Sequence, residues 1–143
     1  MNDLPHIDTP PETEAEWFDA LVRLARYLRS PQGCPWDRRQ SGQSFASFSQ
    51  EETAELVEAY EENDNDHIAE EFGDVLFTLL ASAAAAESEG RFVLRDALAR
   101  THEKMIRRHG HVFGDEAAES PQEAADAWNR VKAQERVGKT RRP

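Results

Sequence analysis

Two pairs of acidic residues are the part of this sequence best suited to carry chemistry. Glu52 and Glu55 lie three residues apart, and so do Glu71 and Asp74. Residues three apart on an α-helix share a face, and both pairs fall in segments whose apolar residues recur at helical spacing. Glu52, Glu55 and Glu71 lie within the apolar stripe of their helices, and Asp74 lies at the edge of the stripe on the second helix. A carboxylate in such a position is costly unless it is paired or bound to a metal ion.

The surrounding stretch offers these carboxylates no Lys or Arg partner. Residues 51–90 contain thirteen Asp and Glu residues but neither of the two basic types. A hard divalent cation would offset the repulsion, and Mg²⁺ takes carboxylate oxygens readily. We therefore predict a Mg²⁺ site built by two facing helices, with four ligands: Glu52, Glu55, Glu71 and Asp74. The competing interpretation is a solvated acidic helix face, because 28 of the 143 residues are Asp or Glu. Spacing alone does not decide between the two.

The elements that must position these residues are helices. No segment alternates apolar and polar residues for long enough to predict a strand, so we expect an all-α fold, a helical bundle of four main helices. A capping box at Thr13 and Glu16 opens the first helix, which stops at Ser30. We expect Trp17 of this helix to lie in the hydrophobic core of the protein.

A short turn joins the two acidic segments, which we expect to be helices over residues 45–62 and 67–89. The connection, residues 63–66, consists of alternating Asn and Asp, which favour turns. A connection this short makes the two helices antiparallel neighbours, which lets the acidic pairs face each other. Further helices are expected over residues 91–113 and after Ser120.

The segment over residues 30–44 is expected to be a loop, because Pro, Gly and Ser punctuate it. Its Trp36 either covers the core or stacks on a planar ligand, and spacing alone favours the cover. The loop also holds Cys34, the only cysteine, so no intrachain disulfide can form. We expect a small buried thiol there.

Length and charge limit the function of the chain. A chain of 143 residues is most simply one domain. We expect it over residues 13–136, between a flexible tail at 1–12 and a basic tail at 137–143. The net charge of −11 argues against nucleic acid as a partner. No apolar run is long enough to cross a membrane and no signal peptide is visible, so we expect a cytoplasmic protein with no membrane partner.

The C-terminal third is suited to supply cations to an anionic ligand, because residues 91–143 carry twelve basic and eight acidic residues. Lys104 and Arg108 lie four apart near the end of a predicted helix, where they would either contact phosphates or stabilise the helix dipole. Trp128 and Lys132 are also four apart, and such a pair is usually packing with a snorkelling amine. Taken alone, each pair favours the structural role.

Seven short motifs, taken in order, resemble those of the MazG family of nucleoside triphosphate pyrophosphohydrolases. They are Cys34-Pro35-Trp36-Asp37, Glu51-Glu52-x-x-Glu55, Glu71-x-Gly73-Asp74, Glu89-Gly90-Arg91-Phe92, Lys104-x-x-Arg107-Arg108-His109, His111-Val112-Phe113-Gly114-Asp115 and Trp128-x-x-x-Lys132. Each motif is weak evidence alone, whereas the ordered set is specific. The chain departs from the family pattern at Gln50, where an aliphatic residue is usual, and at Gly110, where Pro is common.

The resemblance implies a helical bundle that dimerises and hydrolyses a nucleoside triphosphate to a monophosphate and pyrophosphate, clearing aberrant nucleotides or adjusting nucleotide pools. It implies Mg²⁺, with Mn²⁺ as a substitute, held by the four acidic residues of the two pairs. It implies four substrate contacts, which are Lys104, Arg108, Trp128 and Lys132. Trp36 is a further candidate, which would stack on the substrate. Glu51 is a further candidate, to orient water or a second ion.

Three alternatives stay open. The first is a narrower enzyme of the same superfamily, acting on a deoxynucleotide or on phosphoribosyl-ATP. The second is a di-iron or di-manganese carboxylate bundle, which typically carries Glu-x-x-His on facing helices, whereas Glu55 and Asp74 stand in the His position here. The third is a non-enzymatic acidic interaction module, which would explain the charge but not carboxylates on the apolar side of a helix.

Overall fold

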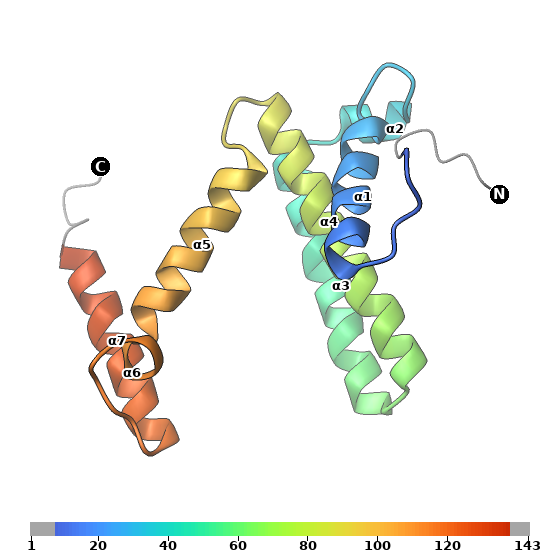
Figure 1. Ribbon diagram of the computed structural model, residues 1–143. Coiled ribbons are helices and arrows are strands. Elements are labelled where there is room, and N and C mark those ends of the chain that lie inside the picture. Colours follow the sequence, from blue (N-terminus) through green and yellow to red (C-terminus); the bar gives the residue numbers. More distant parts are fainter. Residues whose placement is uncertain (1–7, 138–143) are drawn as a thin grey trace. The chain divides into compact units, whose positions relative to one another are not determined.

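Seven α-helices and no β-strand make up the regular structure of the computed structural model, which describes residues 8–137 (Figure 1). In chain order they are α1 (Glu14–Leu28), α2 (Pro35–Arg39), α3 (Gly42–Glu62), α4 (Asn65–Ser88), α5 (Leu94–Arg108), α6 (Gly110–Phe113) and α7 (Pro121–Val137). The expectation of an all-α fold is confirmed. Five helices have 15 or more residues, one more than the four main helices expected.

The chain divides into two compact units, unit 1 up to Leu94 and unit 2 from Arg95 onward. The single domain expected over residues 13–136 stays a prediction, and so do the two tails, since residues 1–7 and 138–143 lie outside the described range. Within residues 8–137, none of the helices combines the length and the hydropathy needed to cross a lipid bilayer.

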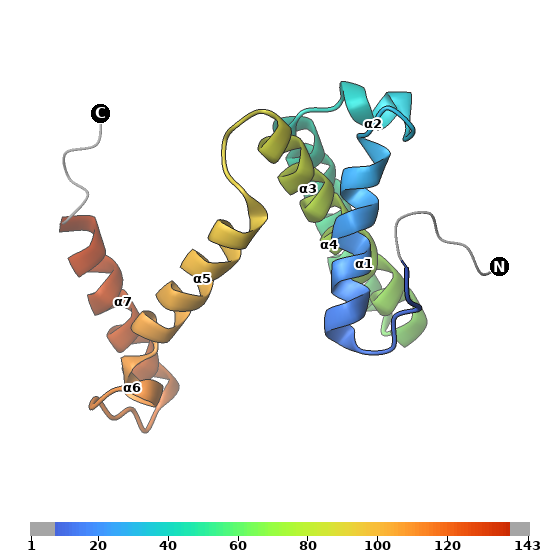
Figure 2. The same cartoon turned by 45° about the horizontal axis from the view of Figure 1, so that its top comes forward.

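In unit 1, α3 and α4 form the expected antiparallel hairpin, which carries both acidic pairs (Figure 1, Figure 2). Asn63 and Asp64 connect the two helices. Asn63 adopts the left-handed conformation with φ of 59°, which Asn tolerates better than most residues. The carboxylate of Asp64 accepts hydrogen bonds from the backbone amides of Asp66 and His67 and so caps α4. The turn therefore brings the two acidic helices side by side.

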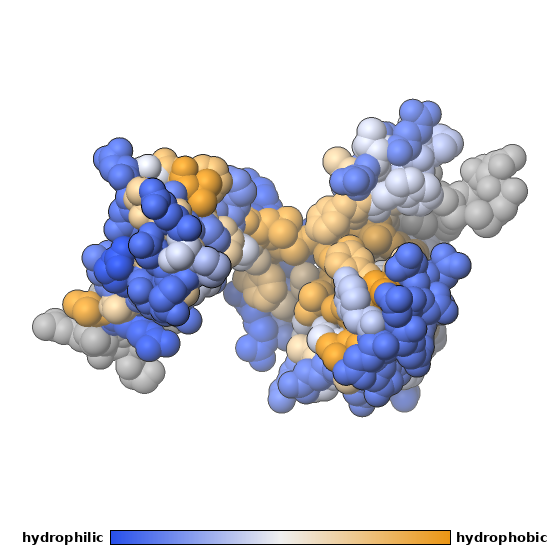
Figure 3. Space-filling view, turned by 90° about the horizontal axis from the view of Figure 1, so that it is seen from below, coloured by the Kyte–Doolittle hydropathy of each residue, from blue (hydrophilic) through white to orange (hydrophobic). Residues whose placement is uncertain are grey.

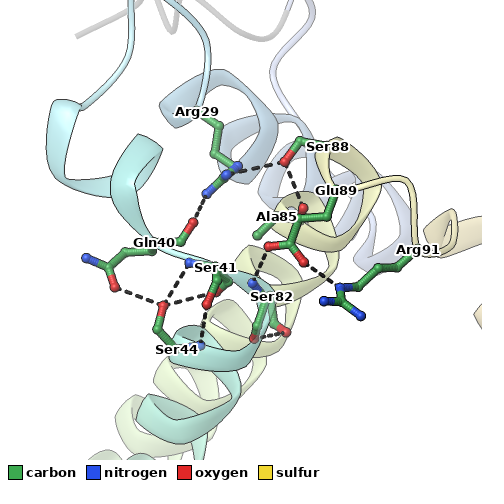
Figure 4. Close-up of polar contacts among 10 residues, drawn as sticks. Arg29, Gln40, Ser41, Ser44, Ser82, Ala85, Ser88, Glu89 and Arg91 are labelled. Carbon is green, nitrogen blue, oxygen red and sulfur yellow. Dashed lines mark hydrogen bonds and ion pairs between the residues drawn. The ribbon is translucent and has the colours of Figure 1, made fainter.

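Polar contacts hold the other end of the hairpin, where α3 begins and α4 ends (Figure 4). The Glu89 carboxylate accepts a hydrogen bond from the Gly42 amide at 2.9 Å, and the Ser82 hydroxyl donates to the Gly42 carbonyl at 2.8 Å. Arg29, which directly follows α1, donates to the Ser88 hydroxyl at 3.3 Å and to two backbone carbonyls in and just after α2. Because both ends are held, the register of α3 against α4 is fixed.

Small side chains let α1 pack closely along α4. Val22 and Ala25 of α1 are buried against Leu80 and Ala84 of α4. Four further alanines between residues 81 and 86 are also buried. Since the distance between packed helices depends on the side chains at the contact, this alanine-rich stretch favours close approach. The core of unit 1 therefore lies toward the C-terminal half of α4.

Trp17 was expected in the core, and this prediction is wrong for the chain by itself. Its side chain is 51% exposed. It lies beside an open apolar groove between α1 and α4, which is also lined by Phe18, Leu21, Phe72 and Leu76. Helical periodicity identifies the apolar side of a helix, but it does not show whether the same chain covers all of that side.

The loop expected over residues 30–44 contains the short helix α2. Trp36 of α2 stacks on Phe48, with ring centroids 5.7 Å apart, and meets Phe45 edge-on at 5.9 Å. The indole thus covers part of the core, as spacing favoured, although 52% of the residue is exposed. Cys34 precedes α2 and is partly rather than fully buried.

Unit 2 contains α6, α7 and all but the first residue of α5. The helix expected over residues 91–113 is interrupted, because the backbone of His109 leaves the helical conformation before α6. Gly110 follows directly, and Gly has low helix propensity. Ser120 caps α7 as expected, since its hydroxyl accepts a hydrogen bond from the Glu123 amide at 3.1 Å.

Candidate metal centre

The carboxylates of Glu52, Glu55 and Glu71 converge between α3 and α4. Each of the three residues has one carboxylate oxygen that lies within 4.8 Å of one oxygen of each of the other two. Asp74 is not a member of this group, but it forms a second one with Glu70 and Glu71 at the same spacing. Because Glu71 belongs to both groups, the four predicted ligands and Glu70 form one continuous acidic cluster.

Two oxygens of the cluster are buried and lack a hydrogen-bond partner. Glu71 is only 7% exposed, and Glu52 is half-buried. The Oε2 atoms of both have no hydrogen-bond partner among the described residues. Since a buried carboxylate oxygen without a partner costs free energy, these atoms have an unused capacity to bind a cation.

Burial raises the pKa of both Glu52 and Glu71 above the ordinary value of a glutamate. The negative charge of Glu55 raises the pKa of each further. The protein alone therefore disfavours the charged form of these two groups, and a bound divalent cation would favour it.

His67 and Glu70 belong to this neighbourhood, and the sequence analysis missed both. His67 Nε2 lies 3.3 Å from a Glu71 oxygen, and its Nδ1 lies 3.1 Å from Glu62 Oε2. The contact with Glu62, followed by that with Glu71, raises the pKa of His67. The four-residue spacing of His67 and Glu71 could have indicated their contact. Glu70 offered no such signal, because it falls outside the apolar stripe.

The arrangement fits Mg²⁺. This ion binds oxygen ligands at about 2.1 Å, so two of its ligand atoms lie at most about 4.2 Å apart. Carboxylate oxygens that lie within 4.8 Å of one another need only small torsional adjustments to reach that spacing. Every candidate ligand is a carboxylate, the donor type that suits Mg²⁺ and Mn²⁺.

Glu51 and Trp36 are the other candidates in unit 1, and their roles stay predictions. Glu51 directly precedes Glu52 and is exposed. Trp36 stacks on Phe48, which lies one helical turn before Glu52 on α3.

The four substrate-contact candidates of the C-terminal third lie in unit 2. Arg108 stands over Trp128, with its Cζ 5.0 Å from the ring centroid, which is a cation–π distance. Lys104 and Lys132 are half-buried, and neither has an ion-pair or hydrogen-bond partner within residues 8–137. Arg108, in contrast, is paired with Glu135, a residue that the sequence analysis did not single out.

Comparison with known proteins identifies the family of this site. Residues 40–113 match the model of the MazG nucleotide pyrophosphohydrolase domain, a range that includes all of α3 and α4. The chain is also similar to the mazG-related protein from Thermotoga maritima, whose crystal structure is known. The two are 30% identical with a TM-score of 0.68, and the match covers 80% of this chain and 98% of the other.

Curated relatives are longer than this chain. It is 43% identical over 119 residues to the nucleoside triphosphate pyrophosphohydrolase/pyrophosphatase MazG of Thermotoga maritima, covering 83% of this chain and 45% of the relative. It is 39% identical over 123 residues to the nucleoside triphosphate pyrophosphohydrolase of Escherichia coli, covering 85% of this chain and 47% of the relative. The chain thus spans less than half the length of these two proteins.

Proposed function

This chain belongs to the MazG nucleotide pyrophosphohydrolase family, and we propose on that premise that it hydrolyses nucleoside triphosphates to a monophosphate and pyrophosphate. The bond cleaved is the anhydride between the α- and β-phosphates, and one water molecule is consumed. The reaction depends on Mg²⁺, with Mn²⁺ as a substitute, and takes place in the cytoplasm, where it removes aberrant nucleotides or adjusts nucleotide pools.

One observation carries the proposal: Glu52 and Glu71 belong to one convergent acidic group, and the Oε2 atom of each is buried without a hydrogen-bond partner among the described residues. Together with Glu55 and Asp74 these residues would hold the ion, and Glu51 would orient water or a second ion. When bound, the ion would neutralise phosphate oxygens and acidify a water molecule. The chain's own contribution is the fixed α3–α4 register, which keeps the carboxylates converged before substrate arrives.

The basic residues of unit 2 provide the substrate contacts in this proposal. Lys104 and Lys132 are free of acidic partners within the described chain, so their ammonium groups are available to phosphates. Trp128 contacts the nucleoside, and Trp36 offers a second aromatic surface. Phosphoryl transfer is catalysed mainly by positioning and charge stabilisation, and these residues supply both.

We also propose that the chain forms a homodimer. Trp17, Phe72 and Leu79 are each about half exposed, at 51%, 59% and 49%. Figure 3, a view from below, shows patches of exposed hydrophobic residues among the hydrophilic ones. Phe72 directly follows Glu71, so a second copy that covered Phe72 would lie near the acidic cluster. Light scattering should give twice the 16.2 kDa chain mass, and Phe72→Glu should halve the observed mass. A wild-type monomer would contradict the dimer.

The test of the activity is a panel of ribo- and deoxynucleoside triphosphates, with phosphoribosyl-ATP included. Each is incubated with the protein in Mg²⁺, in Mn²⁺ and in EDTA. We expect monophosphate and pyrophosphate in either metal and no turnover in EDTA. Release of orthophosphate and a diphosphate would contradict the assigned bond. Turnover of only a deoxynucleotide or of phosphoribosyl-ATP would favour the narrower enzyme, and no turnover at all would favour the interaction module.

A further inference from the structure

Glu135 of α7 binds two consecutive arginines of α5. Its Oε2 accepts a hydrogen bond from Arg107 Nε at 2.8 Å and lies 2.7 Å from Arg107 Nη2 in the ion pair. Its Oε1 accepts from Arg108, with Nε at 3.1 Å and Nη2 at 2.7 Å. Each carboxylate oxygen therefore receives one guanidinium group, and hydrogen bonds between charged partners are about twice as strong as neutral ones. We call these three residues the arginine clasp.

The clasp is well shielded where it meets Trp128. The side chains of Arg108 and Glu135 are only 15% and 13% exposed, whereas that of Arg107 is 45% exposed. The Arg108 guanidinium lies 5.0 Å from the Trp128 ring centroid, and the His109 ring meets the indole edge-on at 5.3 Å. Arg108 therefore has two simultaneous partners, a carboxylate and an aromatic face.

Helical spacing places the proposed nucleotide contacts in line with the clasp. Trp128, Lys132 and Glu135 follow one another at intervals of four and three residues on α7, so they share one face of the helix. The cations near this face divide into two kinds. Both arginines pair with Glu135, and Arg107 also lies 3.4 Å from Glu103, whereas Lys104 and Lys132 have no acidic partner within residues 8–137.

We infer that Glu135 is a positioning residue: it holds Arg108 against Trp128 and thereby fixes the orientation of the indole that contacts the nucleotide. The inference rests on the proposed function, and it changes the expected role of Arg108 from a phosphate contact to a support for Trp128. A planar guanidinium can bind a carboxylate in its plane and an aromatic ring on its face, which a lysine cannot do.

Charge and positioning predict opposite results when Glu135 is replaced. If Glu135 served only to balance charge, Glu135→Gln would make this face more positive and strengthen binding of a triphosphate. If Glu135 positions Arg108, the same variant weakens binding, because a Gln offers the two guanidinium groups a single neutral acceptor in place of two charged oxygens and so loosens Arg108. The sign of the change in KM therefore separates the two roles.

The experiment compares Glu135→Gln with Glu116→Gln in steady-state hydrolysis of the best Mg²⁺-nucleotide. Glu116 is a matched control, because its replacement removes the same charge from unit 2 and breaks an exposed pair with Arg130 at 3.4 Å. We expect KM to rise at least about 10-fold in Glu135→Gln with a smaller change in kcat, the signature of lost binding. Glu116→Gln should stay within about twofold of wild type.

Arg108→Lys provides a second variant that keeps the charge but removes the planar guanidinium. It should raise KM as Glu135→Gln does, and the double variant should be no worse than the worse single one, because both changes break the same unit. If Glu135→Gln loses its helical circular dichroism, Arg108→Lys decides the question.

A KM that is unchanged or lower in Glu135→Gln, or that rises equally in Glu116→Gln, would overturn the positioning role while leaving the proposed function intact. Additive effects in the double variant would also overturn it. A wild-type chain that hydrolyses no nucleoside triphosphate would overturn the inference and the proposed function together.

Discussion

Glu71 is the residue in which geometry and chemistry meet most directly. It belongs to both acidic groups, it is 7% exposed, and one of its oxygens has no partner among the described residues. We predict that Glu71→Gln lowers kcat at least about 100-fold, the scale of losing a group that stabilises transition-state charge. In EDTA the variant should melt at the same temperature or higher, because a neutral amide replaces a buried carboxylate.

Glu58→Gln is the control for this prediction. Glu58 lies on the same hairpin, is exposed and has no partner within residues 8–137, so its replacement should change neither activity nor melting temperature. Steady-state kinetics with Mg²⁺ and thermal melts in EDTA provide the two measurements. An active Glu71→Gln enzyme would remove this residue from the metal centre.

Lys132 tests the substrate side of the proposal at the same scale. Hydrogen bonds to charged groups contribute about 1.5–3 kcal/mol, so Lys132→Met should raise KM by at least about 10-fold. Lys132 is half-buried, and Met keeps an apolar stem of similar length at this position, so the melting temperature should change little. Equal losses of binding and of stability would return Lys132 to a packing role.

At the scale of elements, the end of α4 depends on a left-handed residue. Gly90 has φ of 74°, its amide donates to the Glu87 carbonyl, and the Arg91 amide donates to the Ala86 carbonyl. This is the Schellman pattern of helix termination. Gly90→Ala should destabilise the protein by about 1–2 kcal/mol, because the left-handed conformation strains a residue with Cβ. No atom within 4 Å obstructs the added methyl group, so the cost comes from the backbone alone.

Gly73 gives the opposite expectation in the same helix and serves as the comparison. It lies inside α4 with open space around its Cβ position, and Ala is better than Gly in a helix interior by about 0.5–1 kcal/mol. Urea denaturation of both variants should therefore show opposite shifts in midpoint. A Gly90→Ala variant as stable as wild type would contradict the role assigned to the cap.

The arginine clasp gives unit 2 a defined response to acid. Hydrogen bonds from Arg108 and then Arg107 lower the pKa of Glu135 to about 2. A depressed carboxyl pKa contributes stability that is present above the unfolded value, about 4.3, and is lost as the pH falls toward 2. The difference in melting temperature between wild type and Glu135→Gln should thus be constant from pH 7 to 5 and shrink between about pH 4.5 and 2. A difference that stays constant down to pH 2 would contradict the clasp.

Local sequence signals predicted the helices and turns better than they predicted which side chains are covered by other parts of the protein. The capping box at Thr13 is present as predicted, and a turn does precede α4, although it comprises Asn63 and Asp64 instead of residues 63–66. These features depend on side chains a few residues apart. Trp17 is exposed instead of buried, and Glu135 pairs with arginines 27 and 28 residues away. Such outcomes depend on which surfaces meet in three dimensions, and periodicity carries no information about that choice.

For the whole molecule, the separation of charge along the sequence explains the need for a cation. The acidic hairpin holds thirteen carboxylates within residues 51–90 and no Lys or Arg, whereas residues 91–143 have a basic excess of four, from twelve basic and eight acidic residues. A triphosphate brought to the acidic cluster would be repelled unless a metal ion lay between them. Metal binding therefore belongs to the assembly of the site as well as to its chemistry.

Mg²⁺ should accordingly stabilise the folded protein without any nucleotide present. A ligand that binds only the folded state adds about 2.7 kcal/mol of stability at 100 times its Kd. We predict that millimolar Mg²⁺ raises the melting temperature of wild type and of Glu58→Gln, and that it does so much less for Glu71→Gln. Salt also screens carboxylate repulsion, so NaCl at matched ionic strength is the reference for each melt. A NaCl effect as large as that of Mg²⁺ would mean general screening and no metal centre, whereas a shift that needs Glu71 would mean that the converged carboxylates bind the ion before substrate does.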